Sequence, residues 1–155
     1  MQQFFIANGD FIIKLVLAMG LGMIIGAERA LVHKEAGMKT HALVSMGAAL
    51  FIIISEFLAQ KYSGSTGFNP AMIASNIIVG IGFLGAGSII FQNSRVTGLT
   101  TAGGLWITAG IGMAAGFGLY SLAVIATILV LLIFILLNII EKPIKKISNN
   151  NQSEN

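Results

Sequence analysis

The sequence predicts an integral membrane protein built only of α-helices, five of which cross the bilayer. Three observations indicate this fold class. The mean hydropathy of the 155 residues is +0.88 and only 10% of them are charged, whereas about a quarter of the residues in a soluble domain are charged. The apolar residues fall into five runs, and a helix needs about 20 apolar residues to cross the hydrocarbon core. Most of the 19 glycines lie inside these runs.

Short polar or glycine-containing segments separate the five runs. Pro70 suits the first turn of a helix, where a backbone N–H has no helical partner, and Gly116-Phe117-Gly118 suits a tight turn. We read the first run as a retained span and not as a cleaved signal peptide, because no basic residue precedes Lys14. Residues 1–141 then form one membrane domain. The expected spans are residues 11–27, 40–59, 70–91, 101–117 and 119–140.

The basic residues gather at one end of this arrangement. If all five runs cross, one side holds Arg29, Lys34, Lys39, Arg95, Lys142, Lys145 and Lys146, and the other holds Lys14 and Lys61. The positive-inside rule then places the N-terminus outside and the C-terminus in the cytoplasm. The same rule accounts for the net charge of +3, so nucleic acid is not an expected partner. Residues 142–155 form a basic, polar cytoplasmic tail, which we expect to be disordered from Ile147 onward.

Glycines inside the spans predict close helix packing, because small residues let helix backbones approach one another in lipid. A phosphate-binding loop is disfavoured for the glycine-rich third span, since no strand precedes it and it lacks a lysine. A broken helix that lines a pathway stays open as an alternative there. The expected packing positions are Gly22 and Gly26 in the first span, Gly80, Gly82, Gly85 and Gly87 in the third, and Gly104, Gly112 and Gly116 in the fourth.

A faint internal repeat relates the first two spans to the next two. Gly20-Leu21-Gly22 matches Gly80-Ile81-Gly82, and residues 36–40 resemble residues 97–101. Both pairs of spans run outside–inside–outside, so the repeat would be parallel, with the fifth span as an addition.

The ionisable residues between the first two spans are the strongest candidates for a functional site. Glu28 and Arg29 lie at the membrane edge, where unpaired charges are costly. Adjacent helix residues point about 100° apart, so we expect each to contact another element, with Lys39 or His41 as a partner of Glu28. Interfacial anchoring with a surface ion pair is the alternative.

Other polar residues have simpler expected roles. Thr40 and Thr100 are expected helix N-caps, with contact to a phosphate or other anion as the alternative. Lys14 is expected to extend its ammonium group to the interface, and Glu56 to pair with Lys61 or Asn76.

The sequence favours neither an enzyme nor a metal site. His33 and His41 lack the spacing of a metal motif such as HExxH. No nucleophile, base and orienting group occur together, and no pair of carboxylates suits hydrolysis. The chain has no cysteine, which excludes disulfides and thiolate chemistry. We therefore expect no catalytic residue, no bound metal and no cofactor.

Four motifs in order resemble the MgtC/SapB family of bacterial inner-membrane proteins over about residues 8–140. The motifs are Gly26-Ala27-Glu28-Arg29, Ala36-Gly37-Met38-Lys39-Thr40-His41, Gly80 through Gly87, and Gly98-Leu99-Thr100-Thr101-Ala102. The resemblance implies a multi-pass, non-enzymatic regulator linked to adaptation to low magnesium. It also implies partners among membrane proteins, the proton-translocating ATP synthase among them. Glu28, Arg29, Thr40, His41, Thr100 and Thr101 match the family motifs and are candidate recognition residues. Lys39 and Arg95 are also candidate recognition residues, because they lie in the two turns expected on the same side of the membrane.

The sequence also departs from the family pattern. Lys39 replaces an arginine and Asn76 a glutamine, and Asn69-Pro70-Ala71-Met72 replaces Asp-Pro-x-Arg, with the loss of both charges. Many members continue into a soluble C-terminal domain, whereas this sequence stops after the basic tail. The alternative function is a transporter or channel component for Mg²⁺ or another small ion, working as a homo-oligomer in the lipid bilayer. Mg²⁺ prefers carboxylate oxygens, and Glu56 is the acid expected inside a span.

Overall fold

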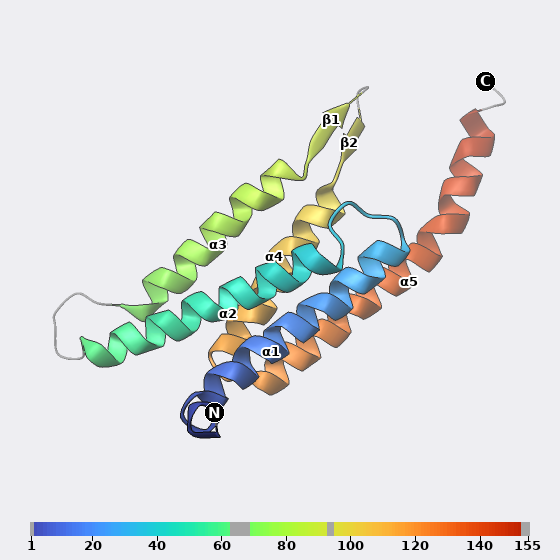
Figure 1. The fold of residues 1–155 in the computed structure, drawn as a ribbon. Helices are drawn as coiled ribbons and strands as arrows, with labels where there is room; N and C mark the ends of the chain where they lie inside the picture. Colours follow the sequence, from blue (N-terminus) through green and yellow to red (C-terminus); the bar gives the residue numbers. More distant parts are fainter. Residues whose placement is uncertain (1, 63–68, 93–94, 153–155) are drawn as a thin grey trace.

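The computed structural model describes residues 2–62, 69–92 and 95–152, which form five helices and a small hairpin (Figure 1). The elements are α1 (Gln2–Leu31), α2 (Met38–Lys61), α3 (Pro70–Gly87), β1 (Ile90–Gln92), β2 (Arg95–Thr97), α4 (Leu99–Gly116) and α5 (Tyr120–Gln152). The predicted helical class is confirmed, apart from the hairpin.

Within the described residues, three helices are long and apolar enough to cross a membrane: Asn8–Leu31, Met38–Lys61 and Tyr120–Ile140. The apolar part of α3 is shorter and covers Ala71–Gly87. Helix α4 has 18 residues, or about 27 Å at 1.5 Å per residue, and many of them are glycine, alanine or threonine. The membrane class is thus supported, while five crossing spans and the sidedness of the termini stay predictions.

Helix α4 lies at the centre of the bundle and contacts each of the other four helices. Its buried face is built mainly of small residues, which include Gly104, Thr108, Gly112 and Gly116. Because this face meets other helices and not lipid, α4 needs less hydrophobic surface than the outer helices. The apolar core that α4 shares with its neighbours contains Ala18, Ile25, Ala49, Ile111, Ala115 and Ala123.

Glycines set the distance between α1 and α2. A Cβ atom added at Gly22 would lie 2.5 Å from the carbonyl oxygen of His41, and one at Gly26 would lie 2.5 Å from the Cα of Met38. Any larger residue at either position would therefore have to push the helices apart. Helix α4 meets α2 in the same way, because a Cβ at Gly112 would overlap the carbonyl oxygen of Ser45 and one at Gly116 would lie 2.9 Å from that of Ala49.

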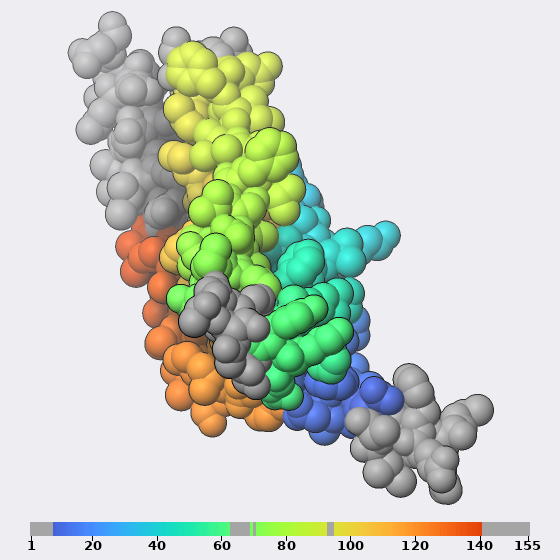
Figure 2. Space-filling view, turned by 90° about the vertical axis from the view of Figure 1, so that its left-hand side faces the viewer, coloured from blue at the N-terminus to red at the C-terminus, as the bar shows by residue number. Residues whose placement is uncertain are grey.

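Helix α3 is packed more loosely than the sequence predicts. A Cβ added at Gly80, Gly82 or Gly87 would meet no atom within 4 Å, and one at Gly85 would make an ordinary 3.6 Å contact with Ala102. Of the four glycines expected to pack in this helix, three therefore lack the expected close contact. In Figure 2 the light green side chains of α3 form a ridge beside those of α2.

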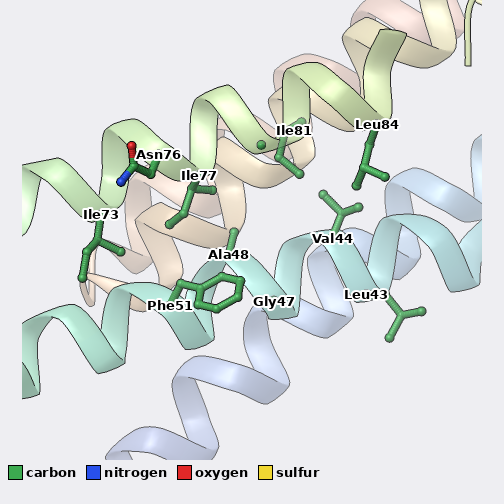
Figure 3. Close-up of a pocket in the computed structure, with 11 residues that line it drawn as sticks. Leu43, Val44, Gly47, Ala48, Phe51, Ile73, Asn76, Ile77, Ile81 and Leu84 are labelled. Atoms are coloured by element: carbon green, nitrogen blue, oxygen red, sulfur yellow. The ribbon is translucent and has the colours of Figure 1, made fainter. Parts of the chain in front are cut away.

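A groove of about 480 Å³ separates α3 from α2. Figure 3 shows Ile77 and Leu84 of α3 on one side and Val44 of α2 on the other. The lining is apolar apart from Asn76, a composition that suits contact with lipid or with another helix.

The connection between α3 and α4 differs from the sequence prediction. Residues 88–91, expected to continue the third span, leave the helix and start an antiparallel hairpin in which Phe91 pairs with Val96. Ser88 ends α3 by donating its Oγ hydrogen bond to the carbonyl of Gly85 at 2.7 Å. Gly98 then turns the chain into α4 with a φ of +86°, a conformation that glycine adopts without strain.

The expected helix starts and the expected tail also need correction. The N-cap positions are Gly37 for α2 and Gly98 for α4, so Thr40 and Thr100 lie inside the first turns and do not cap them. Helix α5 extends to Gln152, so the disorder expected from Ile147 is not found for residues 147–152. A helix that is already formed adds further residues at little cost, and the polar tail follows the long apolar part of α5.

The predicted turn at residues 116–118 is confirmed, with Gly118 at a φ of +73° between α4 and α5. The ribbon places the α1–α2 turn, the hairpin and the C-terminal part of α5 at one end of the bundle, and the N-terminus and the α4–α5 turn at the other (Figure 1). We call the first the inner end and the second the outer end. Every basic residue assigned to the cytoplasm from the sequence belongs to a segment at the inner end.

Candidate functional site

At the inner end, Glu28 and Arg29 form an ion pair with each other, in which Arg29 Nε donates to Glu28 Oε2. The expectation that these neighbours would not pair with each other is therefore wrong. The expectation that each would contact another element is confirmed, with Asn138 and Phe134 of α5 as the contacts rather than Lys39 or His41. Arg29 is only 1% exposed, and a charge buried to this extent needs a nearby counter-charge. Glu28 supplies it and also accepts a hydrogen bond from Asn138 Nδ2 at 3.3 Å, which ties α1 to α5.

An aromatic ring covers the buried guanidinium group. The Cζ atom of Arg29 lies 3.6 Å from the centre of the Phe134 ring, close enough for a cation–π interaction. Phe134 and Asn138 are four residues apart on α5 and so lie on the same face. One face of α5 therefore contacts both members of the ion pair.

His41 brings α2 into the same region. It is fully buried, and its Nδ1 lies 3.0 Å from the carbonyl oxygen of Gly37. Because a carbonyl oxygen only accepts, Nδ1 must carry the hydrogen, which leaves Nε2 of a neutral imidazole as an acceptor. Ser45, one turn further along α2, is also fully buried. We call Glu28, Arg29, His41, Ser45 and Asn138 the inner polar cluster.

Three buried polar atoms of this cluster have no hydrogen-bond partner among the described residues: Arg29 Nη2, His41 Nε2 and Ser45 Oγ. Leaving a buried polar group without a partner costs about 1–3 kcal/mol, so such atoms are rare in folded proteins. Their concentration at one end of the bundle marks it as the place most suited to binding something polar.

The remaining predicted site residues lie around the cluster. Lys39, Thr40, Arg95 and Thr100 are exposed, and Thr101 is 4% exposed. Thr40 and Thr101 line one cleft of about 390 Å³ together with Glu35 and Ser88. Thr100 lines another, of about 270 Å³, together with Gly104 and Phe134. The structure thus gathers Glu28, Arg29 and His41, places two threonines in a neighbouring cleft, and leaves Lys39 and Arg95 on the surface.

Sequence reasoning missed Asn138 and Phe134. The sequence did contain a signal for this contact, because Asn138 is a lone amide in the most apolar run of the chain, four residues after an aromatic residue.

Sequence reasoning also missed the second charged cluster, which lies at the outer end. There Lys14 Nζ is 3.2 Å from Glu56 Oε2 and 3.3 Å from Asp10 Oδ2, and the Tyr120 hydroxyl donates to Asp10 Oδ1 at 3.4 Å.

We call Asp10, Lys14, Glu56 and Tyr120 the outer polar cluster. It corrects the predictions that Lys14 extends its ammonium group to the interface and that Glu56 pairs with Lys61 or Asn76. The spacing of Asp10 and Lys14, four residues apart on a helix, was a recognisable signal. The Glu56 contact joins residues 42 positions apart, and no local pattern predicts it.

In the part of the chain that the structure describes, no three His, Cys, Asp or Glu side chains gather as a metal site would require. His33 is exposed on the α1–α2 turn, whereas His41 is buried in the bundle. The carboxylates of the bundle are instead committed to basic partners, Glu28 to Arg29 and both Asp10 and Glu56 to Lys14.

Comparison with known proteins identifies the family. The model of the MgtC family matches residues 15–143, which is most of the chain and includes both polar clusters except Asp10 and Lys14. The chain belongs to the MgtC family. Helices long and apolar enough to cross a bilayer agree with a membrane location, and no solved structure matches the chain.

Curated relatives of this MgtC-family chain include three bacterial proteins. YhiD of Escherichia coli (strain K12), whose name makes it a candidate magnesium transporter, is 42% identical over 81% of this chain and 60% of its own length. Protein MgtC of Salmonella typhimurium (strain LT2) is 45% identical over 82% of this chain and 52% of its own. An uncharacterized protein of Haemophilus influenzae is 44% identical over 80% of this chain and 55% of its own. The chain thus spans little more than half the length of these relatives.

Proposed function

We propose that this protein is a non-enzymatic regulator of the bacterial inner membrane, which acts by docking on other membrane proteins and serves adaptation to magnesium limitation. The proposal includes the N-terminus outside and the inner end in the cytoplasm, since the positive-inside rule favours basic loops there. Family membership supports the link to magnesium. The proposed partners are membrane proteins, with ATP synthase to be tested by name because of the MgtC/SapB resemblance.

The observation that carries this proposal is the buried, mainly apolar layer between the two polar clusters. Ala49, Ile52, Ile111 and Ala115 are each at most 1% exposed and fill the middle of the bundle. Ser45 and Glu56, on the same helix, are 11 residues apart, or about 16 Å along the axis. A hydrated ion would have to cross a closely packed layer made mainly of apolar side chains, so the described part of the monomer is better suited to docking than to conduction.

The inner end offers a surface for such docking. Lys39 and Arg95 are exposed there, and the hairpin that carries Arg95 also exposes Phe91, which is 74% accessible. Aromatic and arginine side chains together are common anchors of protein interfaces. The partner would therefore present an acidic, partly apolar surface at the membrane edge.

Site-specific photo-crosslinking in native membranes tests the proposal. A crosslinking residue replaces Lys39 or Arg95, and a matched control replaces Gln60, which is exposed at the outer end of α2. We expect one or a few membrane proteins to be captured from the inner positions and not from Gln60. The proposal fails if neither inner position enriches any membrane protein, ATP synthase subunits included, over the control.

A second candidate function is transport of Mg²⁺ or another small ion by an oligomer. Two observations favour it: the name of the Escherichia coli relative, and the α2–α3 groove beside open glycines of α3, where protomers could meet around a shared pathway. Flux of Mg²⁺ into proteoliposomes that contain the pure protein decides between the two. Mg²⁺ flux into these proteoliposomes above that into protein-free liposomes would reverse our ranking.

A further inference from the structure

The buried atoms without partners in the inner polar cluster are chemically complementary. Arg29 Nη2 can only donate a hydrogen bond, Nε2 of a neutral His41 with its hydrogen on Nδ1 can only accept one, and Ser45 Oγ can do both. All three side chains are 1% exposed or less. A ligand that satisfies them must be small and must donate and accept at once.

Gly104 and Phe134 form the wall of the site on the side of α4 and α5. A Cβ added at Gly104 would lie 3.5 Å from His41 Nε2 and 3.3 Å from Phe134 Cζ. The face of the same Phe134 ring lies against the guanidinium group of Arg29. Gly104 thus lies beside both His41 Nε2 and the ring that covers Arg29. Gly104 and Phe134 also line the α4–α5 cleft.

We propose that the inner polar cluster is a buried water site, in which water donates a hydrogen bond to His41 Nε2 and hydrogen bonds continue to Arg29 Nη2 and Ser45 Oγ. Buried waters typically make about three hydrogen bonds to groups that would otherwise lack partners. Water fits where ions do not. The lone pair of His41 Nε2 repels an anion, and the guanidinium of Arg29 repels a cation.

This water site has only one end open to a polar phase. The buried apolar layer of Ala49, Ile52 and Ile111 separates it from the outer polar cluster, so water reaches it from the inner end alone. The inference does not depend on the docking partner, and it adds a hydrated, one-sided pocket to the protein whichever function holds.

Solid-state NMR of the ¹⁵N-histidine-labelled protein in liposomes tests the proposal directly, because the chain has only two histidines. His33→Gln leaves His41 as the only labelled residue. We expect a neutral imidazole with hydrogen on Nδ1, a hydrogen-bonded Nε2, and magnetisation transfer from water to this buried ring. If the His33→Gln protein shows a hydrogen on Nε2 of His41, or no magnetisation transfer from water to its ring, the proposal is overturned without further variants.

Gly104→Ala in the same background provides the second test. Its methyl group would stand 3.5 Å from Nε2 and take the place of the water, so the transfer should fall several-fold. The matched control is Gly103→Ala, at the preceding position of α4, where a methyl group would meet no atom within 4 Å. We expect the control to keep the transfer. Equal transfer in the two variants would contradict the proposed location.

Discussion

The inner and outer polar clusters hold their charges in different ways. In the outer cluster, Lys14 sits between two carboxylates whose side chains are 66% and 35% exposed. In the inner cluster, Arg29 is 1% exposed, has one carboxylate partner and carries a phenyl ring on its face. Lys14 is itself buried, but its two carboxylate partners keep much of their contact with the surroundings, whereas the inner pair depends almost wholly on its protein neighbours. The inner cluster is therefore the more sensitive to substitution.

The largest expected effect is that of Glu28→Gln, which leaves Arg29 buried without a counter-charge. Breaking one side of a buried ion pair typically costs about 3–5 kcal/mol. We expect a loss of this size in the free energy of unfolding, measured by denaturant titration in detergent micelles or bicelles. Glu28→Gln combined with Arg29→Met is the matched control, because it removes both charges and should recover most of the loss. A change below about 1 kcal/mol in the single variant would mean that Arg29 is not isolated from water.

Gly22→Ala tests how closely α1 must approach the inner cluster. Its Cβ would lie 2.5 Å from the His41 carbonyl oxygen and 2.9 Å from Ser45 Cβ, so α1 has to shift. Overpacking of this kind costs about 1–3 kcal/mol, again in the free energy of unfolding. Gly20→Ala is the control on the same helix, since its methyl group would meet no atom within 4 Å. Equal stability of the two variants would contradict the close α1–α2 contact.

Much of the fold follows from local sequence patterns, and this is where prediction succeeded. The apolar runs identified the helices, and Gly116-Phe117-Gly118 identified a turn. The hairpin was missed because Ile90, Phe91 and Val96 are as suited to a membrane helix as to a strand. The structure distinguishes the two, because α3 ends at Gly87 and the positive φ of Gly98 starts a separate helix.

The candidate site was predicted only in part, because its contacts join distant segments. Glu28, Arg29 and His41 were identified from their clustering in one turn. Asn138, which is 110 residues from Glu28, could be placed beside it only once the path of α5 was known. The glycines of α3 were predicted to pack closely, but most of them do not. A glycine-rich pattern predicts close packing without identifying the neighbouring helix.

Asn138→Leu separates the contribution of α5 from that of the ion pair. The substitution removes the hydrogen bond to the charged Glu28 Oε1 but keeps the Arg29 contact, so the expected loss is about 1.5 kcal/mol, the lower end for a hydrogen bond to a charged group. Phe134→Leu is the companion variant, because it keeps an apolar cover over Arg29 but removes the ring. A loss from Asn138→Leu as large as that from Glu28→Gln would show that α5, and not Arg29, holds the carboxylate in place.

The smallest expected effect is that of Lys14→Met in the outer cluster, at about 1 kcal/mol or less, because its carboxylate partners stay partly exposed. The salt dependence of this stability difference tests the comparison between the clusters more sharply than the size of the difference. Salt screens exposed charges but acts weakly on buried ones. The stability difference between the wild-type protein and Lys14→Met should therefore shrink between roughly 0.05 and 0.5 M NaCl, while that for Glu28→Gln stays constant. If both differences shrink together, the inner ion pair is as accessible to the aqueous phase as the outer one.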